Sequence, residues 1–204
     1  MTFSLTHFLD FNLFLLLLFP WAKAFYSTKK VTKASFSSSF ISTVIFIVIY
    51  VSFTKLSSFL NYFKGFTFLE FGIALLVAFL CLFFDFLIYK IVYKKIVYFK
   101  IDNNSIGMLF LLLFMLPFLE EFIYRACLYS FYSVYSSNPI IYIILSSISF
   151  GLNHMVYPKI NVVTKSIWGI FLSILFILFE NIWLCVIVHI ICNLFIYIAG
   201  SRAK

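Results

Sequence analysis

Charged residues are scarce in this sequence. Only 11% of its 204 residues are Asp, Glu, Lys or Arg, whereas soluble domains carry about 25%. Apolar residues make up 64% of the chain, and there are just six glycines. This balance excludes an ordinary soluble domain and predicts a polytopic membrane protein. The net charge of +8 does not indicate nucleic acid as a partner, because the basic residues fall in loops between apolar stretches.

Motifs of several enzyme classes are also missing. No serine stands in a G-x-S-x-G setting, no pair of intramembrane aspartates exists, and no H-E-x-x-H is present. A serine or aspartyl intramembrane protease is therefore disfavoured. No cysteine belongs to a C-x-x-C pair, which predicts packing residues rather than a disulfide framework or a cysteine metal site. The four cysteines, all within apolar segments, are Cys81, Cys127, Cys185 and Cys192.

Seven apolar segments are candidate membrane spans, since a span needs about 20 mostly apolar residues. They cover residues 5–21, 36–53, 66–89, 106–135, 139–157, 166–179 and 182–199. The fourth is long, and its Pro117 predicts a kink. We therefore expect an all-α, polytopic transmembrane helix bundle of about seven spans. We expect a single integrated membrane domain, with an N-terminal three-helix region at 1–105 and core helices at 106–200.

The basic residues favour one orientation of these spans. The loops after spans one, three and five, together with the C-terminal tail, hold 12 of the 15 Lys and Arg residues. These loops face the cytoplasm under the positive-inside rule, so we expect an outside N-terminus and a cytoplasmic C-terminus. The bias toward Phe, Ile, Lys, Ser and Asn, with only six glycines, suggests an AT-rich bacterial genome. The location that we expect is the bacterial cytoplasmic membrane. The residues counted as cytoplasmic loop include Lys90, Lys159 and Lys165.

Two of the seven acidic residues, Glu120 and Glu121, are adjacent within the fourth span. Each carboxylate costs about 2.5–3.5 kcal/mol on insertion scales, and neighbours on a helix point about 100° apart. Arg125 lies one turn after Glu121, so we expect a structural Glu121–Arg125 ion pair. Glu120 then has no partner on its own helix, which suits a general base. The alternative is that Glu120, Glu121 and Arg125 together form one structural packing network.

Two histidines lie in later apolar segments. His154 follows Phe150 by four residues near the cytoplasmic end of span five, where it is either functional or an interfacial histidine. His189 and Asn193 share a face of span seven. Both can donate hydrogen bonds, so they could either stabilise an oxyanion or hold two helices together through polar contacts. Together, three separate helices supply a carboxylate, a histidine and a His/Asn pair, which favours a catalytic site.

The motifs Glu120-Glu121-x-x-x-Arg125, Phe150-x-x-x-His154 and His189-x-x-x-Asn193 resemble, in order, the three motifs of the CPBP family. This family comprises CAAX prenyl proteases and bacteriocin-processing membrane proteins, also called Abi proteins. The resemblance covers roughly residues 114–199.

The resemblance implies an intramembrane glutamic endopeptidase. It implies that Glu120 and His154 activate a water, that His189 and Asn193 form the oxyanion hole, and that Glu121 and Arg125 hold the site together. We expect no cofactor, although Glu120, His154 and His189 could in principle ligate zinc. The expected partners are the lipid bilayer, a membrane-associated peptide or protein substrate such as a bacteriocin, pheromone or CAAX-like peptide, and a peptide exporter, with no nucleic acid.

Three alternatives remain open from the sequence. A zinc-dependent membrane protease would use the same residues. A non-enzymatic bacteriocin self-immunity or scaffold protein would keep the fold, with its motif residues structural. A proton-coupled transporter would need further intramembrane acids, and the candidate for one is Asp85, expected near a cytoplasmic helix end in reach of Lys90 or water.

Overall fold

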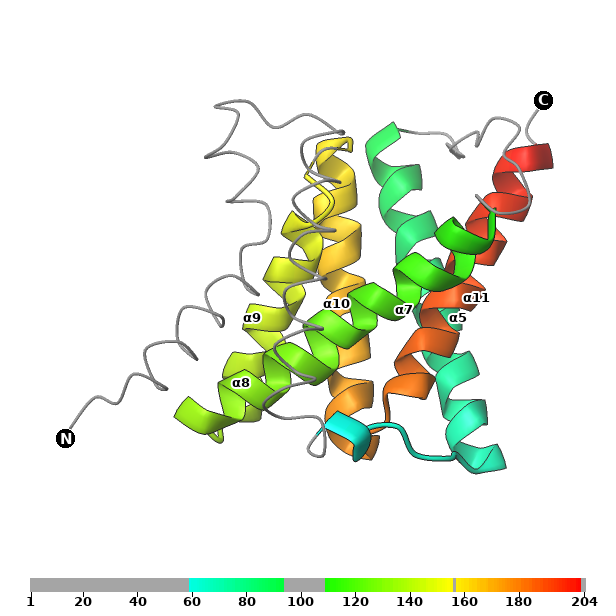
Figure 1. Ribbon diagram of the computed structural model, residues 1–204. Coiled ribbons are helices and arrows are strands. Elements are labelled where there is room, and N and C mark those ends of the chain that lie inside the picture. The colour runs from blue at the N-terminus through cyan, green and yellow to red at the C-terminus, as the bar shows by residue number, and fades with distance from the viewer. Residues whose placement is uncertain (1–58, 94–108, 156, 203–204) are drawn as a thin grey trace.

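The computed structural model describes residues 59–93, 109–155 and 157–202. Within these ranges the regular elements are helices and no strand occurs, which confirms the all-α prediction for the described part (Figure 1). The predicted spans 5–21 and 36–53, and most of the basic loop after span three, lie outside the described residues.

Four long helices and one composite helix form the described bundle (Figure 1). The four are α5 (Phe68–Tyr93), α9 (Pro139–Leu152), α10 (Lys159–Phe179) and α11 (Ile182–Arg202). The composite helix crosses the others obliquely and consists of η1 (Leu111–Met115), α7 (Leu116–Glu121), η2 (Phe122–Cys127) and α8 (Leu128–Tyr135).

The composite helix keeps helical backbone angles where its segments join, so the chain runs on through the predicted kink at Pro117. Pro117 lies in the first turn of α7, directly after the π-helical segment η1. The second π-helical segment, η2, begins immediately after Glu121. Widened π turns thus flank the short helix that carries both intramembrane carboxylates, and such turns are frequent at functional sites.

Three described helices are long and apolar enough to cross a membrane, namely α5, α10 and the part of α11 at Ile182–Ala199. The apolar helix α9 is shorter, with 14 residues. Side chains on the outer face of α5, such as Phe79 and Phe83, are exposed, as expected of a lipid-facing surface. Three candidate membrane spans are therefore present among the described residues, while the number of seven spans and the orientation stay predictions.

Two helix boundaries correct the sequence prediction. The helix α10 begins at Lys159 rather than at residue 166, so Lys159 and Lys165 belong to a helix and not to a loop. The helix α5 continues to Tyr93 and includes Lys90 in its last turn. A hydropathy window misplaces such ends because the polar residues at the start of α10 lower its average, although they still lie on one helical face.

The helices α9 and α10 pack in direct backbone contact. A Cβ added at Gly151 would overlap the Ser166 side chain and lie 2.6 Å from the Val162 carbonyl oxygen. A Cβ added at Gly169 would lie 2.6 Å from the Ser147 Cα. Glycine is therefore required at both crossing points, as is common where membrane helices approach closely.

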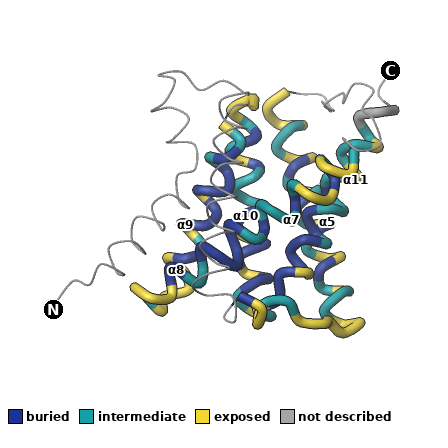
Figure 2. The backbone as a smooth tube through the Cα atoms, viewed as in Figure 1, coloured by how far each residue is buried: buried dark blue, intermediate teal, exposed yellow. Residues whose placement is uncertain are grey.

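The turn between α10 and α11 is tied to the segment before α5. The Asn181 side chain donates to the carbonyl oxygens of Lys64 and Gly65, at 3.1 and 3.2 Å, and accepts from the Trp183 N–H. Glu180 is half-exposed and pairs with Lys64 at 3.4 Å, in agreement with its predicted solvated position. These contacts fix one end of the bundle, and the buried residues concentrate where the helices cross above it (Figure 2).

Candidate active site

The Glu121–Arg125 ion pair expected from the sequence is present in the composite helix. Arg125 Nε lies 3.0 Å from Glu121 Oε2, and both side chains are fully buried. Neither atom has a hydrogen-bond partner with good geometry, so the contact is an ion pair rather than an aligned hydrogen bond. In the low dielectric of a helix bundle, neither charge would be stable alone.

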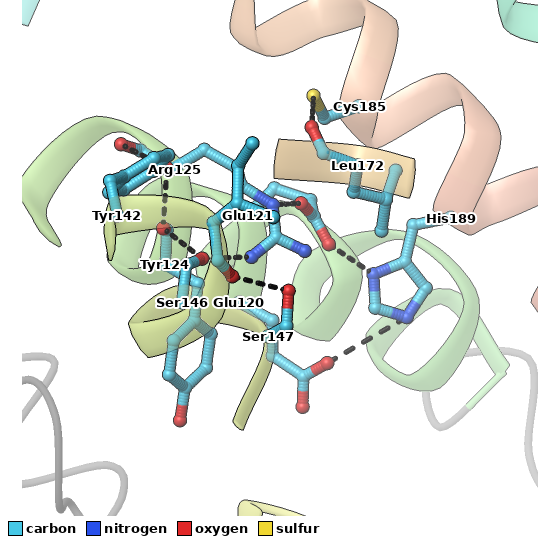
Figure 3. A network of polar contacts seen from close by, with 11 residues as sticks. Glu120, Glu121, Tyr124, Arg125, Tyr142, Ser146, Ser147, Leu172, Cys185 and His189 are labelled. Carbon is cyan, nitrogen blue, oxygen red and sulfur yellow. Dashed lines mark hydrogen bonds and ion pairs between the residues drawn. The ribbon is translucent and has the colours of Figure 1, made fainter. Parts of the chain in front are cut away.

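Arg125 also connects the composite helix to α9 (Figure 3). One guanidinium NH group donates to Ser146 Oγ at 2.9 Å, and the Ser146 hydroxyl donates to the Tyr124 carbonyl oxygen at 3.0 Å. The guanidinium carbon lies 5.0 Å from the centre of the Phe150 ring, a cation–π distance. The ion pair is thereby fixed in position relative to the end of α9.

His189 of α11 approaches the same carboxylate from the opposite side. Its Nδ1 lies 2.8 Å from Glu121 Oε1, and the ring is almost fully buried. An ionised carboxylate can only accept, so Nδ1 carries a proton in this contact. Glu121 therefore contacts both Arg125 and His189. Its contact with His189 sets the orientation and the tautomer of that ring.

Glu120 faces the other nitrogen of the same ring (Figure 3). Its Oε2 lies 3.7 Å from His189 Nε2, and its side chain is 14% exposed, against 0% for Glu121. Its Oε1 accepts from Asn153 Nδ2 at 3.3 Å. The adjacent carboxylates therefore occupy different surroundings, as their angular separation on the helix predicts. Glu121 is enclosed by charged partners, and Glu120 keeps an accessible edge.

His154 lies in the turn after α9, with its Nδ1 3.0 Å from the Phe150 carbonyl oxygen. A carbonyl oxygen can only accept, so Nδ1 is the donor and neutral His154 presents Nε2 as a lone pair. The Phe150 ring is fully buried and separates the functional groups, with ring centroids 5.3 Å from His154 and 5.7 Å from His189. Phe150 thus forms a wall between the two imidazoles.

The structure gathers some of the predicted site residues more closely than others. Glu120, Glu121, Arg125 and His189 form one connected cluster. His154 joins it through Phe150 rather than through a direct hydrogen bond among the described residues. Asn193 is half-buried one turn beyond His189, and its amide makes no hydrogen bond within the described ranges.

Asn153 is the site residue that the sequence did not single out. It is buried, and one of its amide hydrogens reaches the Glu120 carboxylate. Its position beside His154 at the end of an apolar helix was the available signal. An asparagine there is easily read as a helix terminator, because residues that bond to the local backbone are frequent at such ends.

The described residues hold no assembled group of metal ligands. Within residues 59–93, 109–155 and 157–202, no group of three or more His, Cys, Asp or Glu side chains is placed to hold a metal ion. Of the three candidate zinc ligands, Glu120 and His189 lie in the charged cluster, whereas His154 hydrogen-bonds the Phe150 carbonyl through Nδ1 and leaves Nε2 free. The Arg125 guanidinium beside Glu121 would also repel a divalent cation.

A bundle of apolar helices that buries a cluster of carboxylate, imidazole and guanidinium groups defines a helical membrane protein with an intramembrane polar site. Residues 102–195 match the family model described as type II CAAX prenyl endopeptidase Rce1-like. This match covers the region that carries the three motifs, and it confirms the predicted resemblance to the CAAX prenyl protease family. No curated protein and no solved structure matched the chain significantly.

Proposed function

We propose that this protein is an intramembrane endopeptidase that hydrolyses a hydrophobic or membrane-associated peptide with Glu120 as the general base. The observation that carries the proposal is the placement of Glu120. Its carboxylate lies between an imidazole nitrogen at 3.7 Å and a side-chain amide at 3.3 Å, inside a bundle of apolar helices. The Rce1-like family consists of endopeptidases, which supports hydrolysis at the family level.

The proposed reaction begins with a water bound beside Glu120. The carboxylate takes a proton from this water, and the oxygen attacks the peptide carbonyl carbon. His154 offers a lone pair at Nε2 and serves as a second contact that orients the same water. The leaving amine then receives the proton held by Glu120, so the protein returns to its starting state after the two product chains leave.

His189 is proposed to stabilise the oxyanion. Its Nδ1 proton is engaged by Glu121, so Nε2 can donate only when the ring is doubly protonated. Two carboxylates flank that ring, and with Arg125 they make a four-group cluster whose charges cancel in this state. A cluster with no net charge is favoured in the low-dielectric interior of a helix bundle. Asn193, one turn along the same helix face, supplies the second donor.

The reaction proposed here needs no metal ion. The charge arrangement supports this, because the guanidinium of Arg125 already neutralises Glu121 where a cation would otherwise bind. The substrate class follows from the family, so a prenylated peptide ending in a CAAX sequence is the first candidate. A bacteriocin or pheromone precursor in a bacterial cytoplasmic membrane, delivered to or from a peptide exporter, is the second.

Hydrolysis by protein reconstituted in liposomes tests the proposal. The substrates are internally quenched peptides, one farnesylated and ending in a CAAX sequence and one hydrophobic but unprenylated. Glu120→Gln keeps the shape of the side chain but removes the base, so we expect a loss of at least about 100-fold, the lower end for general-base catalysis. Glu180→Gln is the matched control, because Glu180 is half-exposed in the distant turn.

Retained hydrolysis in Glu120→Gln would contradict the proposal. Loss of function in both variants would indicate a general charge effect and not a specific base. The non-enzymatic immunity or scaffold role is distinguished in cells: if Glu120→Ala and His154→Ala both keep full biological function, proteolysis is not what the protein does.

A further inference from the structure

The face of α9 that carries Phe150 and His154 continues toward the start of that helix. Ser146 and Tyr142 precede Phe150 at the same spacing of four residues, so all four side chains form one row. Tyr142 and Ser146, which we call the hydroxyl pair, are fully buried. A buried hydroxyl group in an apolar bundle needs a hydrogen-bond partner, so the partners of these two side chains indicate their role.

Both hydroxyl groups bond to the same backbone atom of the composite helix. The Tyr142 hydroxyl donates to the Tyr124 carbonyl oxygen at 3.0 Å, and the Ser146 hydroxyl donates to that same oxygen at 3.0 Å. The Tyr142 hydroxyl also lies 3.4 Å from the Arg125 carbonyl oxygen. Figure 3 shows the hydroxyl pair reaching the turn that follows Glu121. A carbonyl oxygen has two lone pairs, so it can accept from both hydroxyl groups at once.

The backbone of η2 explains why this oxygen is available. In an α-helix the Tyr124 carbonyl would accept from the N–H of Leu128, four residues later. In this structure the Leu128 N–H instead bonds to the carbonyl oxygens of Arg125 and Ile123. The hydroxyl pair therefore supplies donors to a carbonyl group that has lost its α-helical partner. An unpaired buried carbonyl is costly, so these donors favour the π form of the turn over an ordinary α turn.

The width of this turn bears on the proposed catalytic cluster, because Arg125 lies within η2. Arg125 Nε lies 3.0 Å from Glu121, and another guanidinium nitrogen donates to Ser146 Oγ at 2.9 Å. Glu121 contacts His189 Nδ1 at 2.8 Å, and His189 Nε2 faces Glu120 at 3.7 Å. An unbroken series of polar contacts therefore joins α9 to the proposed base.

Ser146 has the larger part in this arrangement. Its oxygen accepts from Arg125 while its hydrogen goes to the Tyr124 carbonyl. Within the described residues, Nε and the second terminal nitrogen of the guanidinium have no hydrogen-bond partner of good geometry. Ser146 is thus the hydrogen-bond anchor of the guanidinium in the described part of the chain, whereas Tyr142 supports the backbone alone.

The buried acid of α5 does not enter this series of contacts. Asp85 is buried about two turns before the end of α5, which corrects the prediction of a helix-end position in reach of Lys90 or water. Its Oδ1 has no hydrogen-bond partner among the described residues. The described hydrogen bonds that reach the cluster from outside come instead from α9 and the turn after it.

We propose that Tyr142 and Ser146 are positioning residues for the proposed general base. Their hydroxyl groups hold η2 in its π form, and Ser146 also fixes the neighbouring guanidinium. Together these contacts keep the His189 ring in register with Glu120. This inference rests on the proposed function, which gives Glu120 the role of base. Both side chains are fully buried, so their effect on hydrolysis passes through the cluster and not through contact with a substrate.

Nitrogen-15 NMR of the full chain in lipid nanodiscs tests the inference without a substrate. The chain has three histidines, His7, His154 and His189, so side-chain labelling gives few signals. The His189 Nδ1–H signal is assigned by its loss in His189→Gln, and its shift reports the hydrogen bond to Glu121. In Ser146→Ala we expect this signal to move toward the position of an unbonded imidazole.

Neighbouring residues provide two matched controls. Ser147→Ala removes a buried hydroxyl from the same helix, but that hydroxyl donates to a carbonyl oxygen of α9 itself. Tyr129→Phe removes a hydroxyl from a ring whose centre lies 5.0 Å from that of Tyr142. Both controls should keep the wild-type His189 signal. An unchanged signal in Ser146→Ala, or an equal shift in either control, would overturn the inference.

Hydrolysis kinetics give a second readout. Ser146→Ala should lower kcat about tenfold and leave KM within about twofold, because the site is misplaced while substrate binding is retained. Tyr142→Phe keeps the ring and should lose less, since Ser146 still donates to the same oxygen. Tyr142→Phe/Ser146→Ala removes both donors, so we expect a loss of about 100-fold or more, above the product of the single losses.

Unfolding scans and helix content separate a misplaced site from a lost fold. Ser146→Thr keeps the hydroxyl, so a folded Ser146→Thr protein should recover most of the kcat that Ser146→Ala loses; failure to recover would contradict a role for the hydroxyl. If the double variant does not fold, Ser146→Ala decides. A wild-type kcat together with a wild-type His189 signal in that variant overturns the inference.

The positioning role and the protease assignment fail separately. If Glu120→Gln is inactive and Ser146→Ala lowers kcat at constant KM, both stand. If Glu120→Gln is inactive and Ser146→Ala keeps the wild-type kcat, the positioning role is wrong and the protease assignment survives. If Glu120→Gln remains active, the protease assignment fails, while the His189 signal still decides whether the hydroxyl pair positions the cluster.

Discussion

Replacing Gly151 by alanine will force α9 and α10 apart beside the site. The added Cβ would lie 2.6 Å from the Val162 carbonyl oxygen, whereas ordinary contacts begin at 3.4 Å, so the helices must separate locally by about 0.8 Å. Overpacking of this kind costs about 1–3 kcal/mol. Removing a glycine from a helix gains roughly 1 kcal/mol, so the net effect is destabilising. Rotating Ser166 does not relieve the clash, because Val162 contributes backbone.

The displacement also reaches Glu120, the carboxylate proposed as the general base. Asn153 lies two residues after Gly151, and its hydrogen bond to Glu120 is already long at 3.3 Å. A shift of a few tenths of an ångström weakens such a contact steeply. We therefore expect Gly151→Ala to lower hydrolysis by about tenfold or more, even where the protein remains folded, since small misplacements of catalytic groups have large effects on rate.

The measurement pairs thermal or denaturant unfolding with hydrolysis in liposomes. Gly72→Ala in α5 is the matched control, because nothing lies within 4 Å of its added Cβ. This variant should be unchanged or slightly more stable and fully active. Equal behaviour of the two alanine variants would refute the reasoning, since it would show that α9 and α10 are not in backbone contact at Gly151.

Two other predictions concern the charged cluster. Arg125→Met should lower the free energy of unfolding by about 3–5 kcal/mol, because it leaves the fully buried Glu121 unpaired; Lys64→Met, which opens a half-exposed pair, should lower it by less than about 1 kcal/mol. Asn153→Ala should reduce hydrolysis about tenfold and lower the free energy of unfolding by no more than roughly 1.5 kcal/mol, the contribution of one hydrogen bond to a charged group. Unfolding scans of Arg125→Met that match wild type, or a fully active Asn153→Ala, would count against the site as described.

The sequence predicts well those features that depend on one helix. Glu121 and Arg125 pair because residues four apart share a face, and that rule holds wherever the helix is placed. The different surroundings of Glu120 and Glu121 follow from the same helical geometry, because adjacent residues on a helix point in different directions. The apolar segments from residue 66 onward also locate the described helices, because a helix in a bilayer satisfies its own backbone hydrogen bonds.

Features that depend on contacts between helices could not be predicted in this way. Glu121 meets His189 across 68 positions of sequence, and Asn153 meets Glu120 across 33. Periodicity specifies which face a residue occupies but not which helix covers that face. Lys165 is another such case, because a lysine before an apolar run is normally read as a loop residue, whereas the structure places it inside α10 with its ammonium over the Trp168 ring.

The distribution of charges explains why such a site can exist in an apolar bundle at all. The composite helix alone carries two carboxylates, Glu120 and Glu121, against one cation, Arg125, and His189 of α11 approaches both carboxylates. Cancellation occurs only after the helices pack together. Correct assembly is then a condition for the cluster, because an isolated composite helix would leave Glu120 without the contacts that His189 and Asn153 supply from other parts of the bundle.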